Sequence, residues 1–172
     1  RQVVTAVGYS AEIFAGTIEE NVTVGREHLD ASQVRWALQL AQLDPDLVNM
    51  PDGIRTRLVA GGQNLSRGQV QRLMIARAVV DKPSLLVLDE ALTGIDEGTA
   101  QRILDAIFDP SQSWTIVDIS HEPAVVMRAD TVHVLANGKI VESGSAATLA
   151  ADSDTEFARL FPRLSKQLRE AN

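Results

Sequence analysis

The chain has 172 residues, 45% of them hydrophobic, which is enough for one compact domain with a core and too little for two ordinary domains. A formal net charge of −7 argues against a broad basic surface, so we expect no nucleic-acid partner. The chain contains no cysteine, which excludes disulfides, thiolate nucleophiles and zinc–thiolate sites. Because residue 1 is Arg1 and a strand-like segment follows at once, we expect a piece of a larger protein.

The first third of the chain predicts a strand, a helix and two turn regions. Residues 3–7 are apolar and β-prone, which indicates a strand. Apolar positions within residues 31–43 follow helical spacing, and either Asp30 or Ser32 is suited to cap that helix. Residues 51–53 and 60–64 predict a turn and a flexible loop.

The middle of the chain predicts a helix followed by a buried strand. Ser66 and Gln69 have the spacing of a capping box, and the apolar face that follows predicts a helix that ends before Lys82-Pro83. The continuous apolar run at residues 85–88 is typical of a parallel strand that is buried on both faces.

Strands and helices continue to alternate toward the end of the chain. We expect a helix over residues 97–108, a strand over 114–119, and a hairpin of residues 131–135 and 139–142 around an Asn-Gly turn. Residues 155–169 predict one amphipathic helix. This alternation predicts an α/β fold, a three-layer core that carries a helical insertion.

The segment Leu65-Ser66-Arg67-Gly68-Gln69 opens the middle helix and is a candidate phosphate site. Unpaired N–H groups and a partial positive charge at a helix start attract phosphate oxygens, and Gly68 allows their close approach. Read alone, the same residues are also an ordinary helix cap.

Asp89 and Glu90 follow the apolar strand and would lie at its carboxyl end, where open α/β sheets bind ligands. Asp89 is suited to hold Mg²⁺, and Glu90 to polarise the water that attacks the γ-phosphorus of a nucleotide. The alternative is a solvated strand end. Together with the capped helix, the two acids indicate nucleotide hydrolysis.

His121 follows the strand at 114–119 and is suited to contact a γ-phosphate oxygen and to orient Glu90. A passive surface histidine is the alternative. Asp96, in Leu92-Thr93-Gly94-Ile95-Asp96, either serves a functional loop or caps the next helix.

Taken in order, these segments resemble the signature motif, Walker B motif, D-loop and switch histidine of ATP-binding cassette (ABC) ATPases. Residues 13–22 and 50–56 are similar to segments of exporter-type members. The resemblance implies a P-loop NTPase-like core with a helical subdomain, truncated before the Walker A motif. It divides the chain into a core strand and Q-loop region (1–12), the helical subdomain (13–66), the RecA-like core (67–150) and a C-terminal helix (151–172).

The resemblance also implies the roles of single residues, because in this family two such domains close head to tail around two ATP molecules. Glu90 would be the catalytic base, His121 would contact the γ-phosphate, and Asp89 would hold magnesium. The residues that would serve the nucleotide bound by the partner domain are Ser66, Arg67, Gly68, Gln69 and Asp96. The implied cofactors are ATP and Mg²⁺.

The family further implies partners and a location. The partners would be a second nucleotide-binding domain, in a homo- or heterodimer, and the coupling helices of a transmembrane domain, close to residues 14–22. The protein would lie at the cytoplasmic face of the cell membrane as part of an exporter.

Three departures from the family pattern limit this transfer of roles. No Gly-x-x-x-x-Gly-Lys-Ser/Thr occurs in the chain, so we expect the Walker A loop upstream of Arg1 and no turnover by this piece alone. Tyr9 stands where the family has a magnesium-contacting glutamine, and Arg67 replaces the first glycine of the signature.

Alternatives are a non-catalytic, nucleotide-regulated subunit and a soluble ABC ATPase. Glu90 and His121 argue against the first, and the exporter-like segment argues against the second.

Overall fold

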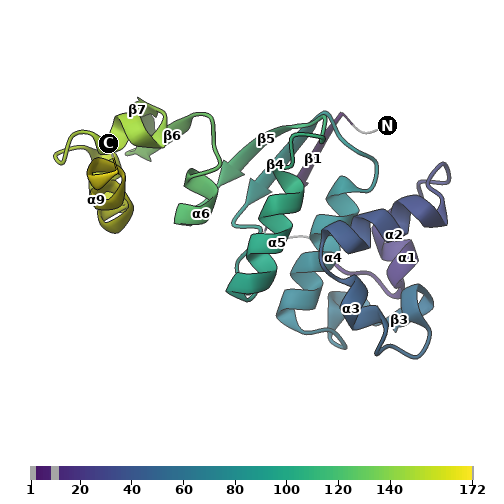
Figure 1. Ribbon diagram of the computed structural model, residues 1–172. Helices are drawn as coiled ribbons and strands as arrows, with labels where there is room; N and C mark the ends of the chain where they lie inside the picture. The colour runs from purple at the N-terminus through teal and green to yellow at the C-terminus, as the bar shows by residue number, and fades with distance from the viewer. Residues whose placement is uncertain (1–2, 9–11, 172) are drawn as a thin grey trace. The chain divides into compact units, whose positions relative to one another are not determined.

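The computed structural model describes residues 3–8 and 12–171, and the chain forms two compact units, Arg1–Ile119 and Ser120–Asn172 (Figure 1). Each unit has its own hydrophobic core. The finer division at residues 12, 66 and 150 stays a prediction.

The first unit is built on a parallel sheet with the strand order β1-β4-β5. These strands are β1 (Val4–Val7), β4 (Leu85–Asp89) and β5 (Thr115–Ile119), and they confirm the strands expected in these regions. In the register, Val7 lies beside Leu88, and Leu88 beside Asp118. The carboxyl ends of β4 and β5 therefore meet at one edge of the sheet, as an α/β fold requires.

Helix α4 (Arg67–Val79) is the centre of this unit, and α5 (Glu97–Ile107) packs into the same core. Both helices share that core with one face of the sheet, where Leu86 and Leu88 are fully buried. On the other face Val4, Val117 and Ile119 are exposed. The expectation that the strand at 85–88 is buried on both faces is therefore wrong for the described residues, because the burial of β4 alternates along the strand.

The predicted helical insertion lies between β1 and α4 (Figure 1). It contains α1 (Ile18–Thr23), α2 (Ala31–Leu40) and α3 (Asp44–Leu47), with Asp30 as the N-cap of α2. Helix α2 ends earlier than expected, and Gln42 soon after it takes a left-handed φ of 55°.

The region expected as a loop at residues 60–64 is more regular than its sequence indicates. The short strand β3 (Arg57–Leu58) pairs with β2 (Gly16–Thr17), and short 3₁₀ turns cover Gly53–Arg55 and Ala60–Gly62. The Asn64 side chain accepts a hydrogen bond from Val59 N and donates one to Arg57 O, at 3.1 and 2.9 Å. These bonds close the loop before α4.

The second unit contains the expected hairpin, formed by β6 (Val132–Ala136) and β7 (Lys139–Gly144). Asn137 and Gly138 have φ of 51° and 75°, as the two central residues of a type I′ turn require. The helices of this unit are α6 (Pro123–Val126), α7 (Ala146–Ala150), α8 (Glu156–Leu160) and α9 (Pro162–Glu170).

The expectation of a single helix over residues 155–169 is wrong, because the helical conformation is interrupted between α8 and α9. Phe161, the residue before Pro162, has φ −122° and ψ 61°, outside the helical region. Proline disfavours a helical conformation in the residue before it and lacks an N–H of its own, so a new helix starts at Pro162.

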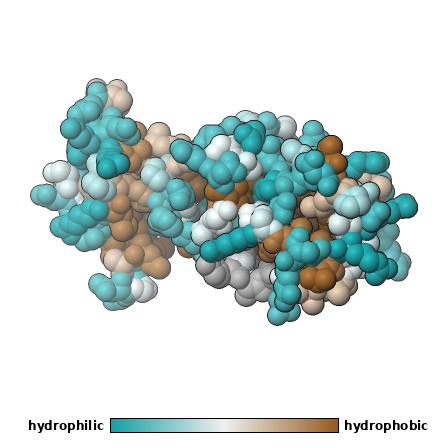
Figure 2. Space-filling model, turned by 90° about the horizontal axis from the view of Figure 1, so that it is seen from below, coloured by the Kyte–Doolittle hydropathy of each residue, from teal (hydrophilic) through white to brown (hydrophobic). Residues whose placement is uncertain are grey.

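Figure 2 shows brown apolar areas between teal hydrophilic ones on each unit. In the second unit the exposed apolar side chains include Leu135, Ile140 and Val141 of the hairpin. Within residues 3–8 and 12–171, every helix is too short or too polar to cross a membrane.

Candidate functional site

The N-terminal tip of α4, residues 66–69, has the geometry expected from its sequence. Ser66 is the N-cap; its Oγ accepts a hydrogen bond from Gln69 N at 3.2 Å, and its own N donates to Gln69 Oε1 at 2.8 Å. The capping box is thereby confirmed. Ser66 and Arg67 are exposed, so the positive end of this 13-residue helix opens to the surface of the unit.

A second predicted segment, residues 92–96, lies directly against this tip. A Cβ placed on Gly68 would lie 3.2 Å from the carbonyl oxygen of Gly94, and one on Gly94 would lie 3.3 Å from Arg67 Nε. Gly94 also has φ 85°, a conformation that only glycine adopts without strain. The fold therefore brings Arg67 and Gly68 together with the loop that leads to Asp96.

Asp96 is the N-cap of α5 and accepts a hydrogen bond from Thr99 N at 3.0 Å. The hydrogen bonds with Thr99 hold the pKa of this exposed carboxyl below its ordinary value. The capping interpretation of Asp96 is confirmed, and its contribution to a nucleotide site stays a prediction.

Asp89 and Glu90 lie at the carboxyl end of β4, as expected. Asp89 is exposed, and the chain passes it at Gly8, where an added Cβ would lie 3.8 Å from Asp89 Cβ. Glu90 has a left-handed φ of 51°, which is uncommon outside glycine and favours a functional interpretation. Its N donates to Ile119 O at 2.9 Å, and Thr93 Oγ1 donates to Glu90 Oε2 at 3.3 Å. The first contact holds the Glu90 backbone at the end of β5, and the second restrains its carboxylate.

Asp118, which the sequence analysis did not single out, adds a third carboxyl group to this edge of the sheet. Burial raises its pKa to about 6, and repulsion from Glu90 and Asp89 acts in the same direction. The signal is present in the sequence, since Asp118 is a charged residue within the apolar run of residues 116–119. We call Asp89, Glu90 and Asp118 the carboxylate edge.

The carboxylate edge suits a hard divalent cation in part. Mg²⁺ prefers oxygen ligands and is commonly held by one or two carboxylates together with substrate phosphates and water. Asp89 offers an exposed carboxylate of this kind. Among the residues that the structure describes, no three His, Cys, Asp or Glu side chains form a metal site. The remaining ligands of a cation at Asp89 would be the phosphate oxygens and waters that commonly complete a Mg²⁺ site.

His121 belongs to the second unit. Its side chain is 76% exposed, and Nε2 lies 3.9 Å from Glu122 Oε1. Its contact with a γ-phosphate stays a prediction. Tyr9 lies outside the described residues.

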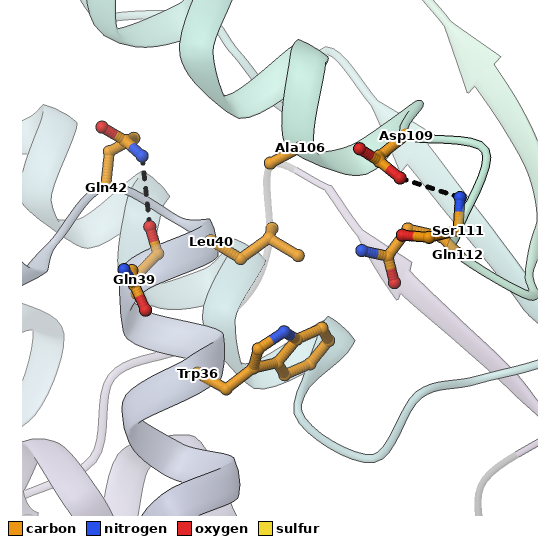
Figure 3. Close-up of a pocket in the computed structure, with 8 residues that line it drawn as sticks. All are labelled: Trp36, Gln39, Leu40, Gln42, Ala106, Asp109, Ser111 and Gln112. Atoms are coloured by element: carbon orange, nitrogen blue, oxygen red, sulfur yellow. Dashed lines mark hydrogen bonds between the residues drawn. The ribbon is translucent and has the colours of Figure 1, made fainter.

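A hollow between α2 and α5 lies apart from these residues (Figure 3). The Trp36 ring forms one wall, and Ala106 of α5 and Asp109 from the loop after α5 lie across from it. None of the predicted site residues lines it. The candidate site is therefore the α4 tip and the carboxylate edge.

Three curated relatives resemble this chain. It is 34% identical over 158 residues to an uncharacterized ABC transporter ATP-binding protein, YfiB, of Bacillus subtilis, covering 90% of this chain and 27% of that one. It is 33% identical over 161 residues to an ATP-dependent lipid A-core flippase of Saccharophagus degradans, with 94% and 27% covered. It is 36% identical over 171 residues to ABC transporter B family member 16 of Arabidopsis thaliana, with 98% and 14% covered.

The chain thus spans at most about a quarter of the length of these relatives. Among solved structures, a bacterial Atm1-family ABC exporter with ATP bound superposes with a TM-score of 0.86 at 30% identity, over 94% of this chain and 28% of that one. The likeness confirms a truncated P-loop NTPase-like fold. The sequence profile of the ABC transporter family matches residues 2–93, more than half of the sequence. The chain belongs to the ABC transporter family.

Proposed function

We propose that the chain is part of the ATP-binding and ATP-hydrolysing domain of an ABC exporter. The observation that carries this proposal is the placement of Glu90 at the carboxyl end of a central parallel strand, oriented by Thr93 and by the backbone of Ile119. The names of the relatives support it, since they include an ATP-dependent flippase and an exporter with ATP bound.

In this proposal Glu90 acts as a general base on the water that attacks the γ-phosphorus of ATP. The water oxygen forms a bond to phosphorus, the bond from the γ-phosphorus to the bridging oxygen breaks, and ADP leaves with that oxygen. The proton of the water passes to the Glu90 carboxylate. Mg²⁺, held in part by Asp89, would neutralise charge on the phosphate oxygens. His121 would donate a hydrogen bond to the γ-phosphate.

The α4 tip would face the nucleotide that a second nucleotide-binding domain holds. Ser66 and Gly68 would approach the phosphates, Arg67 would add positive charge, and Asp96 would link the two nucleotide sites. Such a dimer, homo- or heteromeric, would close on ATP and drive movement in transmembrane domains through their coupling helices. The domain would then lie at the cytoplasmic face of the membrane.

The proposal requires a phosphate-binding loop that these 172 residues do not contain, because no Gly-x-x-x-x-Gly-Lys-Ser/Thr occurs among them. We therefore expect the 172-residue chain alone to bind ATP weakly and not to hydrolyse it. Turnover has to be measured in the complete transporter that carries this segment.

The test compares Glu90→Gln with Glu97→Gln in that complete transporter. Removing a general base is expected to lower kcat for ATP by at least about 100-fold, because a positioned base contributes on this order. Glu97 is an exposed residue in the first turn of α5, and its variant should keep the rate of the unchanged protein. Equal, near-zero rates in the unchanged protein and in Glu90→Gln would instead favour a non-catalytic, nucleotide-regulated subunit.

A further inference from the structure

The α4 tip is connected to the helical insertion through one carboxylate, Asp46 of α3. Asp46 Oδ1 accepts a hydrogen bond from Gln69 Nε2 at 2.7 Å, and Asp46 Oδ2 accepts one from Arg72 Nη1 at 2.6 Å. Both oxygens of the carboxylate thus bind α4. The side chains of Arg72 and Asp46 are 14% and 24% exposed, so water weakens this pair less than it weakens an open surface pair.

Gln69 is bound at both ends of its amide. Oε1 accepts from Ser66 N at 2.8 Å, and Nε2 donates to Asp46. An amide has one acceptor and one donor group on the same rigid plane, so a carboxylate that fixes the donor end also fixes the acceptor end. Asp46 therefore restrains the backbone of Ser66 through Gln69.

Arg72 makes a second connection from Asp46 to the same turn. Its Nε donates to Gly68 O at 3.3 Å, and its guanidinium also donates to the carbonyl oxygen of Gln42 in the turn before α3. Asp46 thus restrains Ser66 through Gln69 and Gly68 through Arg72. These are the two residues of the tip that the proposed function places at the phosphates.

We propose that Asp46 is a positioning residue that sets the geometry of the α4 tip for the nucleotide held by the partner domain. This proposal rests on the proposed function of the tip. Asp46 itself touches no substrate; it acts through Gln69 and Arg72. Gln69 accordingly acts on Ser66 and takes part in binding only through it.

The experiment uses the complete transporter and measures the KM and kcat of ATP hydrolysis for Asp46→Ala, Asp46→Asn and Asp44→Ala. Asp46→Ala is expected to raise KM for ATP about three- to tenfold, because the tip loses a charge-assisted restraint. Asp46→Asn retains an acceptor for Gln69 and should fall between Asp46→Ala and the unchanged protein. Asp44 is exposed on the same helix, and its variant is the matched control with an unchanged KM.

Repeating Asp46→Ala in a Ser66→Ala background distinguishes the positioning role of Asp46 from a purely structural role. If Asp46 acts through the tip, the two changes are not additive, and Asp46→Ala should then raise KM by a smaller factor than it does with Ser66 present, because only the restraint on Gly68 through Arg72 remains. The same increase in KM in both backgrounds would overturn the proposal. So would an unchanged KM in Asp46→Ala when Glu90→Gln abolishes turnover.

A second measurement keeps this inference separate from the proposed function. Hydrogen exchange of the backbone amides at residues 67–70 should be faster in Asp46→Ala than in Asp44→Ala, with or without hydrolysis. Unchanged exchange at these amides would overturn the positioning role even if Glu90→Gln behaves as a catalytic-base variant.

Discussion

The two ends of α4 are held by arginines in different ways. Toward the N-terminal tip, Arg72 pairs with the carboxylate of Asp46 near the surface. Toward the C-terminal end, Arg77 donates to oxygens of the chain segment that precedes α2: the carbonyl oxygens of Glu12 and Asn21 and the side-chain oxygen of Asn21. Burial lowers the pKa of Arg77, and the nearby Arg26 acts in the same direction.

This difference indicates different tasks for the two ends. A guanidinium that binds both the backbone and the side-chain oxygen of one buried asparagine makes a rigid joint, because each bond lost there leaves a polar group without water or partner. Arg77 also lies over the ring of Phe14, 5.8 Å from its centre, and Asn21 is fully buried. An ion pair near the surface is easier to rearrange and is sensitive to salt. We infer that the Arg77 end is held by bonds that salt does not weaken, whereas the Arg72 end is held by an ion pair that salt weakens.

The largest effect on stability is therefore expected at the rigid end. Arg77→Ala should lower the free energy of unfolding of the first unit by about 2–4 kcal/mol, because it removes several hydrogen bonds and leaves the amide of a buried asparagine with fewer partners. Urea unfolding of the 172-residue chain followed by tryptophan fluorescence measures it, since both tryptophans, Trp36 and Trp114, lie in that unit. A loss below about 1 kcal/mol would contradict the rigid joint.

The Arg72 end should show a smaller effect of a different character. Arg72→Ala is expected to cost about 1–2 kcal/mol in the same assay, because water can hydrate the partly exposed Asp46 once its partner is gone. The loss should shrink as sodium chloride is added, whereas the loss in Arg77→Ala should change little. Equal salt dependence of the two variants would remove the distinction between the ends.

The smallest effect concerns the carboxylate edge, where like charges meet. The pKa of Asp118 is raised from 3.8 to about 6, so folding favours its protonated form. Its stabilising contribution is present in full below about pH 4 and is lost as the pH rises through about 6. The free energy of unfolding of the first unit changes between about pH 4 and about pH 8. Because Asp118 is partly exposed, we expect Asp118→Asn to reduce that change by only about 1 kcal/mol.

This prediction is tested by urea unfolding of both proteins across that pH range. The carboxylates that do not interact with Asp118 are common to the two proteins, so their contributions cancel in the difference. Parallel pH profiles would show that Asp118 titrates at its ordinary value and does not interact with Asp89 and Glu90.

Local signals in the sequence predicted most elements of the fold. The Ser66–Gln69 capping box, the Asn137-Gly138 turn and the apolar strand before Asp89 each depend on neighbouring residues only, and the structure confirms them. The break before Pro162 is also a local signal, but the amphipathic pattern continues across it and predicts one helix where the structure has two.

The features that the sequence did not predict depend on distant pairs. Strands β2 and β3 pair residues about forty positions apart, as Gly16 with Leu58. Asp46 contacts Gln69 across 23 positions, and the raised pKa of Asp118 depends on its burial and on Glu90 and Asp89 at the end of the neighbouring strand. Contacts between distant positions leave no local pattern in a single sequence. The connection from α3 to the tip is therefore seen only in the structure.

The most direct test of this account is a structure of the complete transporter carrying Glu90→Gln, with Mg²⁺ and ATP bound. We predict that Ser66 and the N–H of Gly68 lie within hydrogen-bonding distance of the γ-phosphate of the ATP held by the partner domain, with Gln69 still bound to Asp46. A closed dimer in which the α4 tip faces solvent, with the phosphates contacted elsewhere, would contradict the account.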